Sequence, residues 1–244
     1  MNMPTEISNR KVVVASLTGS HNYNLNNENS DRDYKYFVLP TFEDLYKGKF
    51  FATSAESKEM DFTAHDVRKL FELVSKANLN FIEILFSREL QYDDAFVTIF
   101  NIREYLVRCV RHSMKSSTHG MFHQKMSGIF KGTETTQPIV DRLGYDTKAA
   151  HHALRCLYTL ERYAETESME KALWYEEGDP QRKTLLDIKN GVYTSYDDFL
   201  FFVHEWQATK QDDVFAYYEG LTDNRSIFNE LDSWMMKYIQ QRMK

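Results

Sequence analysis

Cysteine is scarce in this chain of 244 residues, which contains only Cys109 and Cys156. A framework of disulfides is therefore excluded, and because both residues fall in segments with helical periodicity we expect a reduced, cytoplasmic protein. Long apolar runs are also lacking. No window approaches the roughly 20 apolar residues of a membrane span, and no long apolar segment follows the first basic residues. We therefore expect neither export nor a membrane partner.

Chain breakers and positive charge are also limited. The chain has 9 glycines and 4 prolines, and so few breakers favour long helices. A formal net charge of −6 argues against wholesale, non-specific binding of nucleic acid, although a local basic site is compatible with it. The length permits one large domain or two small ones.

The most informative stretch lies close to the start of the chain. An apolar run at 12–15 leads to Gly19 and Ser20, and a polar loop then reaches Asp31 and Asp33. In an extended strand these two aspartates project from one face, where adjacent carboxylates repel each other unless a cation lies between them. Such hard oxygen ligands suit Mg²⁺ or Mn²⁺. Glycine allows close approach of a bulky anion and serine offers a hydroxyl and an N–H, so the pattern predicts a metal–nucleotide site.

This stretch resembles the motif of the polymerase-β-like nucleotidyltransferases, and more narrowly that of the predicted bacterial and phage nucleotidyltransferases. That motif runs Gly-Ser-x-x-Tyr-x-Leu, a short polar loop, then Ser-Asp-x-Asp-Tyr. Here residues 19–25 read GSHNYNL and residues 30–34 read SDRDY. Asn24 stands where the family commonly has glycine, and asparagine tolerates left-handed backbone geometry. Further similarity extends to about residue 206.

Sequence patterns predict the elements around this motif. Strands are expected at 11–17 and 33–39, a short helix at 41–48 with Thr41 as its N-cap and Gly48 as its stop, an edge strand at 50–53, a strand at 58–63, and a helix that ends near Asn78. From about residue 93 the pattern is helical. We expect an α+β fold, with a nucleotidyltransferase-type mixed sheet and flanking helices over 1–92 and an all-helical domain over 93–244 that forms the other wall of a cleft.

Two further acids lie between residues 58 and 87. In the family a third carboxylate comes from a neighbouring strand, and the resemblance assigns that role to Asp61. Glu59 lies on the same face of the expected strand and competes with it, and an ordinary surface acid is the alternative. Glu83 stands alone among apolar residues, so it either orients a basic side chain near the site or is a peripheral helix acid. We leave it out of the catalytic set.

A basic region lies in the helical part. Residues 103–155 contain nine Lys/Arg, four Asp/Glu and five of the eight histidines. In a helix capped by Asp146 or Thr147, four basic side chains fall on one stripe: Lys148, His151, His152 and Arg155. The family has a similar Lys-x-x-x-His-x-x-Arg pattern, which implies phosphate contacts for the first, third and fourth of these residues. A solvated or salt-bridged helix face is the alternative.

The resemblance implies transfer of a nucleoside monophosphate from an NTP by a two-metal mechanism. Asp31, Asp33 and Asp61 would be the metal-binding and catalytic carboxylates. The residues assigned to the nucleotide are Gly19, Ser20, His21, Ser30, Lys148, His152 and Arg155. His21 either touches the nucleotide or hydrogen-bonds its own loop. The acceptor and the preferred base stay open, and so do a catalytically silent binding protein and a toxin–antitoxin nucleotidyltransferase that modifies tRNA or protein.

Overall fold

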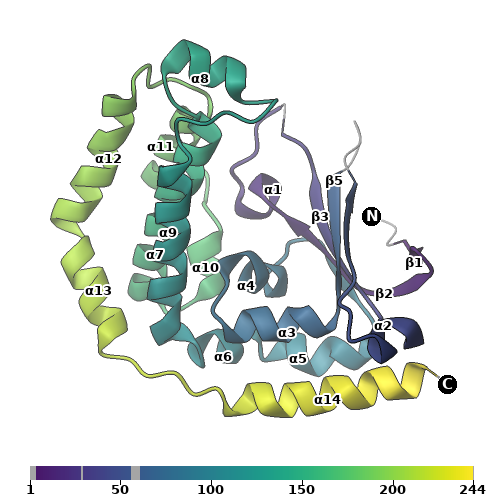
Figure 1. The fold of residues 1–244 in the computed structure, drawn as a ribbon. Helices are drawn as coiled ribbons and strands as arrows, with labels where there is room; N and C mark the ends of the chain where they lie inside the picture. The colour runs from purple at the N-terminus through teal and green to yellow at the C-terminus, as the bar shows by residue number, and fades with distance from the viewer. Residues whose placement is uncertain (1–3, 29, 56–60, 244) are drawn as a thin grey trace. The chain divides into compact units, whose positions relative to one another are not determined.

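The computed structural model describes residues 4–28, 30–55 and 61–243 (Figure 1). It confirms an α+β fold with a mixed sheet and an all-helical C-terminal region. The chain divides into two compact units. The sheet unit contains the residues up to Val110 together with those from Asp223 onward, and the helical unit contains residues 111–222.

The sheet has six strands within the described residues. They are β1 (Glu6–Ile7), β2 (Arg10–Thr18), β3 (Asp33–Val38), β4 (Ala52–Ala55), β5 (Asp61–Asp66) and β6 (Leu90–Tyr92). The order is β1-β2-β3-β5-β4, with β6 also paired to β2. β3 and β5 run parallel, and the other paired strands run antiparallel. The expected strands at 11–17 and 33–39 are β2 and β3, and the expected edge strand at 50–53 corresponds to β4.

Both faces of the central strands are covered, which explains why β2 is apolar along most of its length. One face holds an apolar cluster of Val12, Ala15, Leu17, Tyr34, Tyr36, Val38 and Ala64. The other face carries Asp33 and Lys35, which alternate with the buried tyrosines along β3. Helices α1 and α4 pack against β2, and α3 packs against β5. Asp33, Lys35 and Asp61 on the sheet are partly buried.

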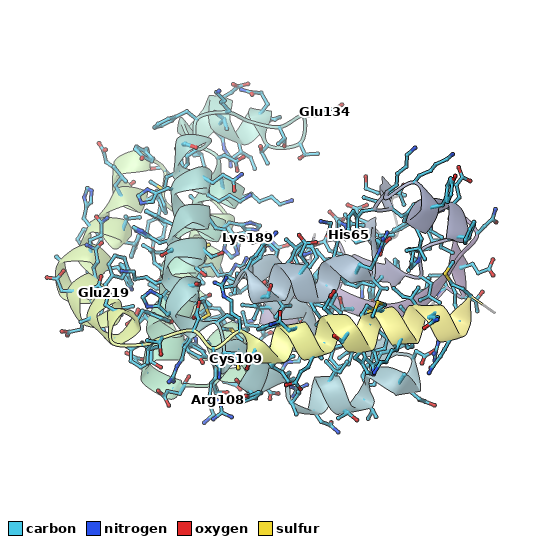
Figure 2. The ribbon with its side chains drawn as sticks, turned by 60° about the horizontal axis from the view of Figure 1, so that its bottom comes forward. His65, Arg108, Cys109, Glu134, Lys189 and Glu219 are labelled. Carbon is cyan, nitrogen blue, oxygen red and sulfur yellow. The ribbon has the colours of Figure 1, made fainter. Side chains whose placement is uncertain are left out.

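Short helices surround the sheet. They are α1 (Ser20–Tyr23), α2 (Phe42–Tyr46), α3 (Arg68–Ser75), α4 (Leu79–Leu85), the 3₁₀ helix η1 (Asp94–Phe96), α5 (Val97–Asn101) and α6 (Arg103–Arg108). The last helix, α14 (Ser226–Arg242), returns to this unit and packs on α3 (Figure 1). Its Arg242 Nη2 donates to Asp93 Oδ1 at 2.8 Å. At the other end, Asn224 N donates to the carbonyl of Cys109 at 2.9 Å, and Figure 2 shows Cys109 beside the start of α14.

The helix caps follow the sequence with one exception. Thr41 caps α2 in a reciprocal capping box with Asp44, and Gly48 follows that helix with a φ of 62°. The prediction that Asn78 ends the helix after β5 is wrong. That helix, α3, stops at Ser75, and the Asn78 side chain accepts from Asn80 N to begin α4. Asparagine is favoured at both kinds of helix end, so its identity alone does not choose between them.

The helical unit is built around one long central helix, α9 (Thr147–Thr166). The others are α7 (Arg111–Ser127), α8 (Gln137–Leu143), α10 (Met169–Leu173), α11 (Pro180–Lys189), α12 (Tyr196–Thr209) and α13 (Gln211–Glu219). α9 packs against α7, α10 and α11, and it is buried over most of its length. Among the described residues, no helix is both long enough and apolar enough to cross a membrane.

Candidate functional site

The end of β2 brings backbone and carboxylate together. Gly19 follows the strand with φ 70° and ψ −154°, a conformation that is essentially restricted to glycine. A Cβ atom at Gly19 would lie 2.5 Å from Oδ2 of Asp33. The absence of a side chain at this position therefore lets the backbone pass directly beside the Asp33 carboxylate. This contact joins the two halves of the motif, which are separated by a polar loop in the sequence.

Asp33 and Asp61 begin two neighbouring strands. Because β3 and β5 are parallel, with Asp33 opposite Asp61 in their register, the two side chains project from the same face of the sheet. Both residues are partly buried. On the other side of β3, Thr18 of β2 pairs with Asp33, and its Oγ1 donates to the Asp33 carbonyl at 3.3 Å. The structure thus brings together two of the three predicted carboxylates on strands that fix their direction.

The structure does not add a third acid to this pair. Asp31 is exposed and precedes β3, which begins at Asp33, so strand alternation does not set its direction. Glu59, the competitor of Asp61, lies outside the described residues. In the described part of the chain, no three His, Cys, Asp or Glu side chains are close enough to form a metal-binding cluster. A metal-binding role for Asp31 therefore stays a prediction.

The loop between α1 and β3 is held by its own polar groups. Asn24 has a φ of 61°, the left-handed geometry for which asparagine is a substitute for glycine. His21 Nε2 lies 3.0 Å from the carbonyl oxygen of Ser30. Ser30 Oγ donates to Asn27 Oδ1 and accepts from Asn27 N, each at 2.9 Å. The His21 and Ser30 side chains therefore stabilise the loop, and their contact with a nucleotide stays a prediction.

A buried ion pair lies beside the carboxylates. Glu83 of α4 is only 3% exposed, and its Oε1 lies 3.2 Å from Nζ of Lys35, which is two residues beyond Asp33 on the same face of β3. Tyr23 of α1 donates its hydroxyl to Oε2 of the same glutamate. Of the two interpretations that the sequence allows for Glu83, the structure supports a buried acid that orients a basic side chain.

Sequence reasoning missed Lys35 and Tyr23. A signal for the first was present, because Lys35 follows Asp33 at the two-residue period of a strand and so shares its face. Tyr23 belongs to the motif, but nothing in a single sequence indicates that its hydroxyl meets an acid 60 residues away.

The predicted basic stripe of the helical unit is mostly buried. Asp146 caps α9, as expected, and accepts from the backbone N–H groups of the first turn. Of the four basic residues, Lys148 is exposed, His152 is partly buried, and His151 and Arg155 are 3% and 4% exposed. The residues therefore share a stripe, but the stripe is not a solvated helix face.

Burial also sets the charge of this stripe. It lowers the pKa of His151 to about 3, although the hydrogen bond between Nδ1 and the carbonyl of Leu185 at 2.9 Å opposes that shift. Burial likewise lowers the pKa of His152 well below its usual value, and Arg155 and Lys125 add to the effect. Both histidines are therefore neutral at pH 7, and the positive charge resides on the lysines and the arginine.

One comparison with known proteins identifies a family. Residues 3–237 match the model of a family described as the RNA repair pathway DNA polymerase beta family (RlaP). A search of curated proteins finds no match. The match spans both the sheet unit and the helical unit, and it confirms the resemblance to polymerase-β-like nucleotidyltransferases.

Proposed function

From the premise that the chain belongs to the RNA repair pathway DNA polymerase beta family, we propose that it transfers a nucleoside monophosphate from an NTP to a hydroxyl group of an acceptor. One observation carries the proposal. Asp33 and Asp61 lie side by side at the start of parallel strands, and the Gly19 backbone passes beside Asp33. Paired carboxylates next to a close-approach glycine suit a triphosphate with its cation.

The donor set fits a divalent cation. Asp33 and Asp61, joined by Asp31 from the loop, would hold Mg²⁺ or Mn²⁺, since carboxylate oxygens are the ligands that these ions prefer. When bound, such ions supply positive charge that stabilises the attacking and leaving oxygens in the transition state. In this proposal Gly19 and Ser20 hold the outer phosphates. Phosphate contacts by Lys148, His152 and Arg155 stay a prediction from the family resemblance.

The reaction is an in-line displacement. The acceptor oxygen forms a bond to the α-phosphorus of the NTP, and the bond from that phosphorus to the oxygen that bridges to the β-phosphate breaks. Pyrophosphate leaves, and the proton of the acceptor hydroxyl passes to the carboxylate of Asp61. In this proposal Asp33 is oriented for metal binding by its position at the start of β3 and by the Gly19 backbone beside it.

We propose an RNA end as the acceptor. The family description refers to an RNA repair pathway, which favours RNA over a protein hydroxyl or a small molecule. The discriminating measurement is transfer of label from an α-labelled NTP to single-stranded RNA. RNA with a free 3′-hydroxyl should gain the label, and RNA with a 3′-phosphate should not. Label that appears on a protein instead would reject the RNA acceptor and favour a toxin-type transferase. Label on a small molecule would also reject the RNA acceptor.

The nucleotide site is tested separately by calorimetry with each of the four NTPs and Mg²⁺. The wild type should bind at least one NTP in a metal-dependent manner, and Asp33→Asn should lose that binding while remaining folded. Asp141→Asn, a change of the same charge at an exposed helical position, is the matched control. A folded wild type that binds no NTP would reject the proposal, and a wild type that binds NTP without transferring it would favour a catalytically silent binding protein.

A further inference from the structure

The ion pair between Lys35 and Glu83 joins three elements of the candidate site. Lys35 lies on β3 and Glu83 lies on α4. The phenol that bonds the glutamate is that of Tyr23 on α1, the helix that begins at Ser20 directly after Gly19. The Lys35 and Glu83 side chains are 17% and 4% exposed. A buried ion pair gives weak evidence for stability, because desolvation offsets most of the attraction. Its place beside the proposed metal-binding carboxylates therefore calls for another explanation.

Lys35 is a potential competitor for any cation at the two aspartates. It follows Asp33 by two residues on the same face, so the Cα atoms are separated by about 6.6 Å along the strand. Lys35 also pairs in register with Thr63, the second residue after Asp61 on β5. A lysine side chain is long enough to span that separation, and an ammonium group near two carboxylates would neutralise them.

The structure shows the ammonium group held by α4. Lys35 Nζ donates to the carbonyl of Asn80 at 2.8 Å and to Glu83 Oε1 at 3.2 Å, and it lies 5.5 Å from the centre of the Phe81 ring. All three partners belong to α4. Among them, only Glu83 carries a charge that balances the ammonium group.

We infer that Glu83 is a positioning residue that keeps the Lys35 ammonium group bound to α4, so that it does not compete with a divalent cation for Asp33 and Asp61. This inference rests on the proposed function. Loss of the Glu83 charge leaves an unbalanced ammonium group close to the two aspartates. It should weaken cation binding both by repulsion and by direct competition for the carboxylates.

The test measures binding of Mn²⁺ alone to the full chain, with free Mn²⁺ read from its electron paramagnetic resonance signal. Glu83→Gln should weaken the affinity about tenfold, which corresponds to about 1.4 kcal/mol. Adding Lys35→Met should restore it to within about twofold of the wild type, because a neutral pair replaces the ion pair. Glu72→Gln, which frees Lys69 and Lys76 on α3, makes the same charge change and should leave the affinity unchanged.

Restored Mn²⁺ affinity in the double variant would distinguish a positioning role of Glu83 from a purely structural one. If Glu83 served only the fold, the double variant would bind Mn²⁺ as weakly as Glu83→Gln or more weakly, and that result would overturn the inference. Unchanged affinity in Glu83→Gln would overturn it as well. If Glu83→Gln does not fold, Glu83→Asp can be used, because it keeps the charge but has a shorter side chain. It should weaken Mn²⁺ affinity less than Glu83→Gln would. Wild-type Mn²⁺ affinity in Glu83→Asp would overturn the inference.

Failure of the proposed function has a different signature. If the wild type binds no Mn²⁺, or if Asp33→Asn leaves its binding unchanged, the proposed metal site itself is rejected, and the inference falls with it. If the wild type binds Mn²⁺ through Asp33 and only the Glu83 variants disagree, the metal site stands and the positioning role is rejected.

Discussion

Replacing Gly19 with alanine is the most direct perturbation of the site. The new Cβ would lie 2.5 Å from Asp33 Oδ2, and the backbone at φ 70° and ψ −154° disfavours any side chain. Backbone strain of this kind costs about 1–3 kcal/mol. Turning the Asp33 side chain out of the way costs about 0.5–1.5 kcal/mol more. We therefore expect Gly19→Ala to lower the free energy of unfolding by about 2–4 kcal/mol and to abolish nucleotide transfer.

The assay combines urea denaturation with NTP binding. Gly48→Ala is the matched control, because its φ of 62° is also left-handed but no atom lies within 4 Å of the added Cβ. It should cost about 1–2 kcal/mol and leave binding unchanged. In an Asp33→Ala background, Gly19→Ala should cost less than in the wild type, because the clash is gone and only the strain remains. Equal cost in the two backgrounds, or wild-type NTP binding by Gly19→Ala, would refute the close contact.

Three further perturbations test other parts of the chain. Lys148→Gln, at an exposed position, should weaken NTP binding about tenfold without changing the unfolding free energy. The control Lys183→Gln should change neither quantity. If Lys148→Gln binds NTP as tightly as the wild type, the predicted phosphate contact of Lys148 is rejected. The pKa of His151 is about 3 in the folded protein, which is below its unfolded value of about 6.5. The stability that depends on neutral His151 is therefore present above about pH 6.5 and is lost as the pH falls towards 3. The free energy of unfolding should fall by at most about 1.4 kcal/mol per pH unit in this range. His151→Gln should flatten that part of the urea-denaturation profile, and parallel profiles would contradict the assignment. Arg10 holds the pKa of the Asp44 carboxyl well below its usual range through two hydrogen bonds of 2.8 Å. Asp44→Asn should therefore lower the unfolding free energy at pH 7 by about 2–3 kcal/mol in the same assay. A decrease of less than about 0.5 kcal/mol would contradict this role of the ion pair.

The features that the sequence predicts well are local. The apolar run of β2 and the alternation of β3 place two strands without any knowledge of their partners. Thr41 identifies a helix start because this cap and its N3 acid lie three residues apart, and the capping box is present. The Gly-Ser and Asp-x-Asp motif indicates Asp33 because its residues lie within one short segment, from the end of β2 through α1 to the start of β3.

Features that depend on distant partners were not predictable. The register that places Asp61 beside Asp33 requires knowledge of a parallel pairing across about 28 residues, and only the family resemblance suggested it. The helical period places Arg155 and His151 on one stripe of α9, but it does not show that other helices cover that stripe. A single helix pattern reports which residues share a face, and burial depends on the remainder of the fold.

The hydrogen bond from Asn224 to Cys109 has a consequence for how the protein is made. It brings together the two points at which the chain leaves and re-enters the sheet unit, so residues 111–222 form an insertion in that unit. A ribosome must therefore synthesise the whole helical unit before α14 can cover α3, and the sheet unit stays unfinished until α14 has emerged. A short linker between Val110 and Asp223 would remove this delay and yield a sheet unit that is continuous in sequence.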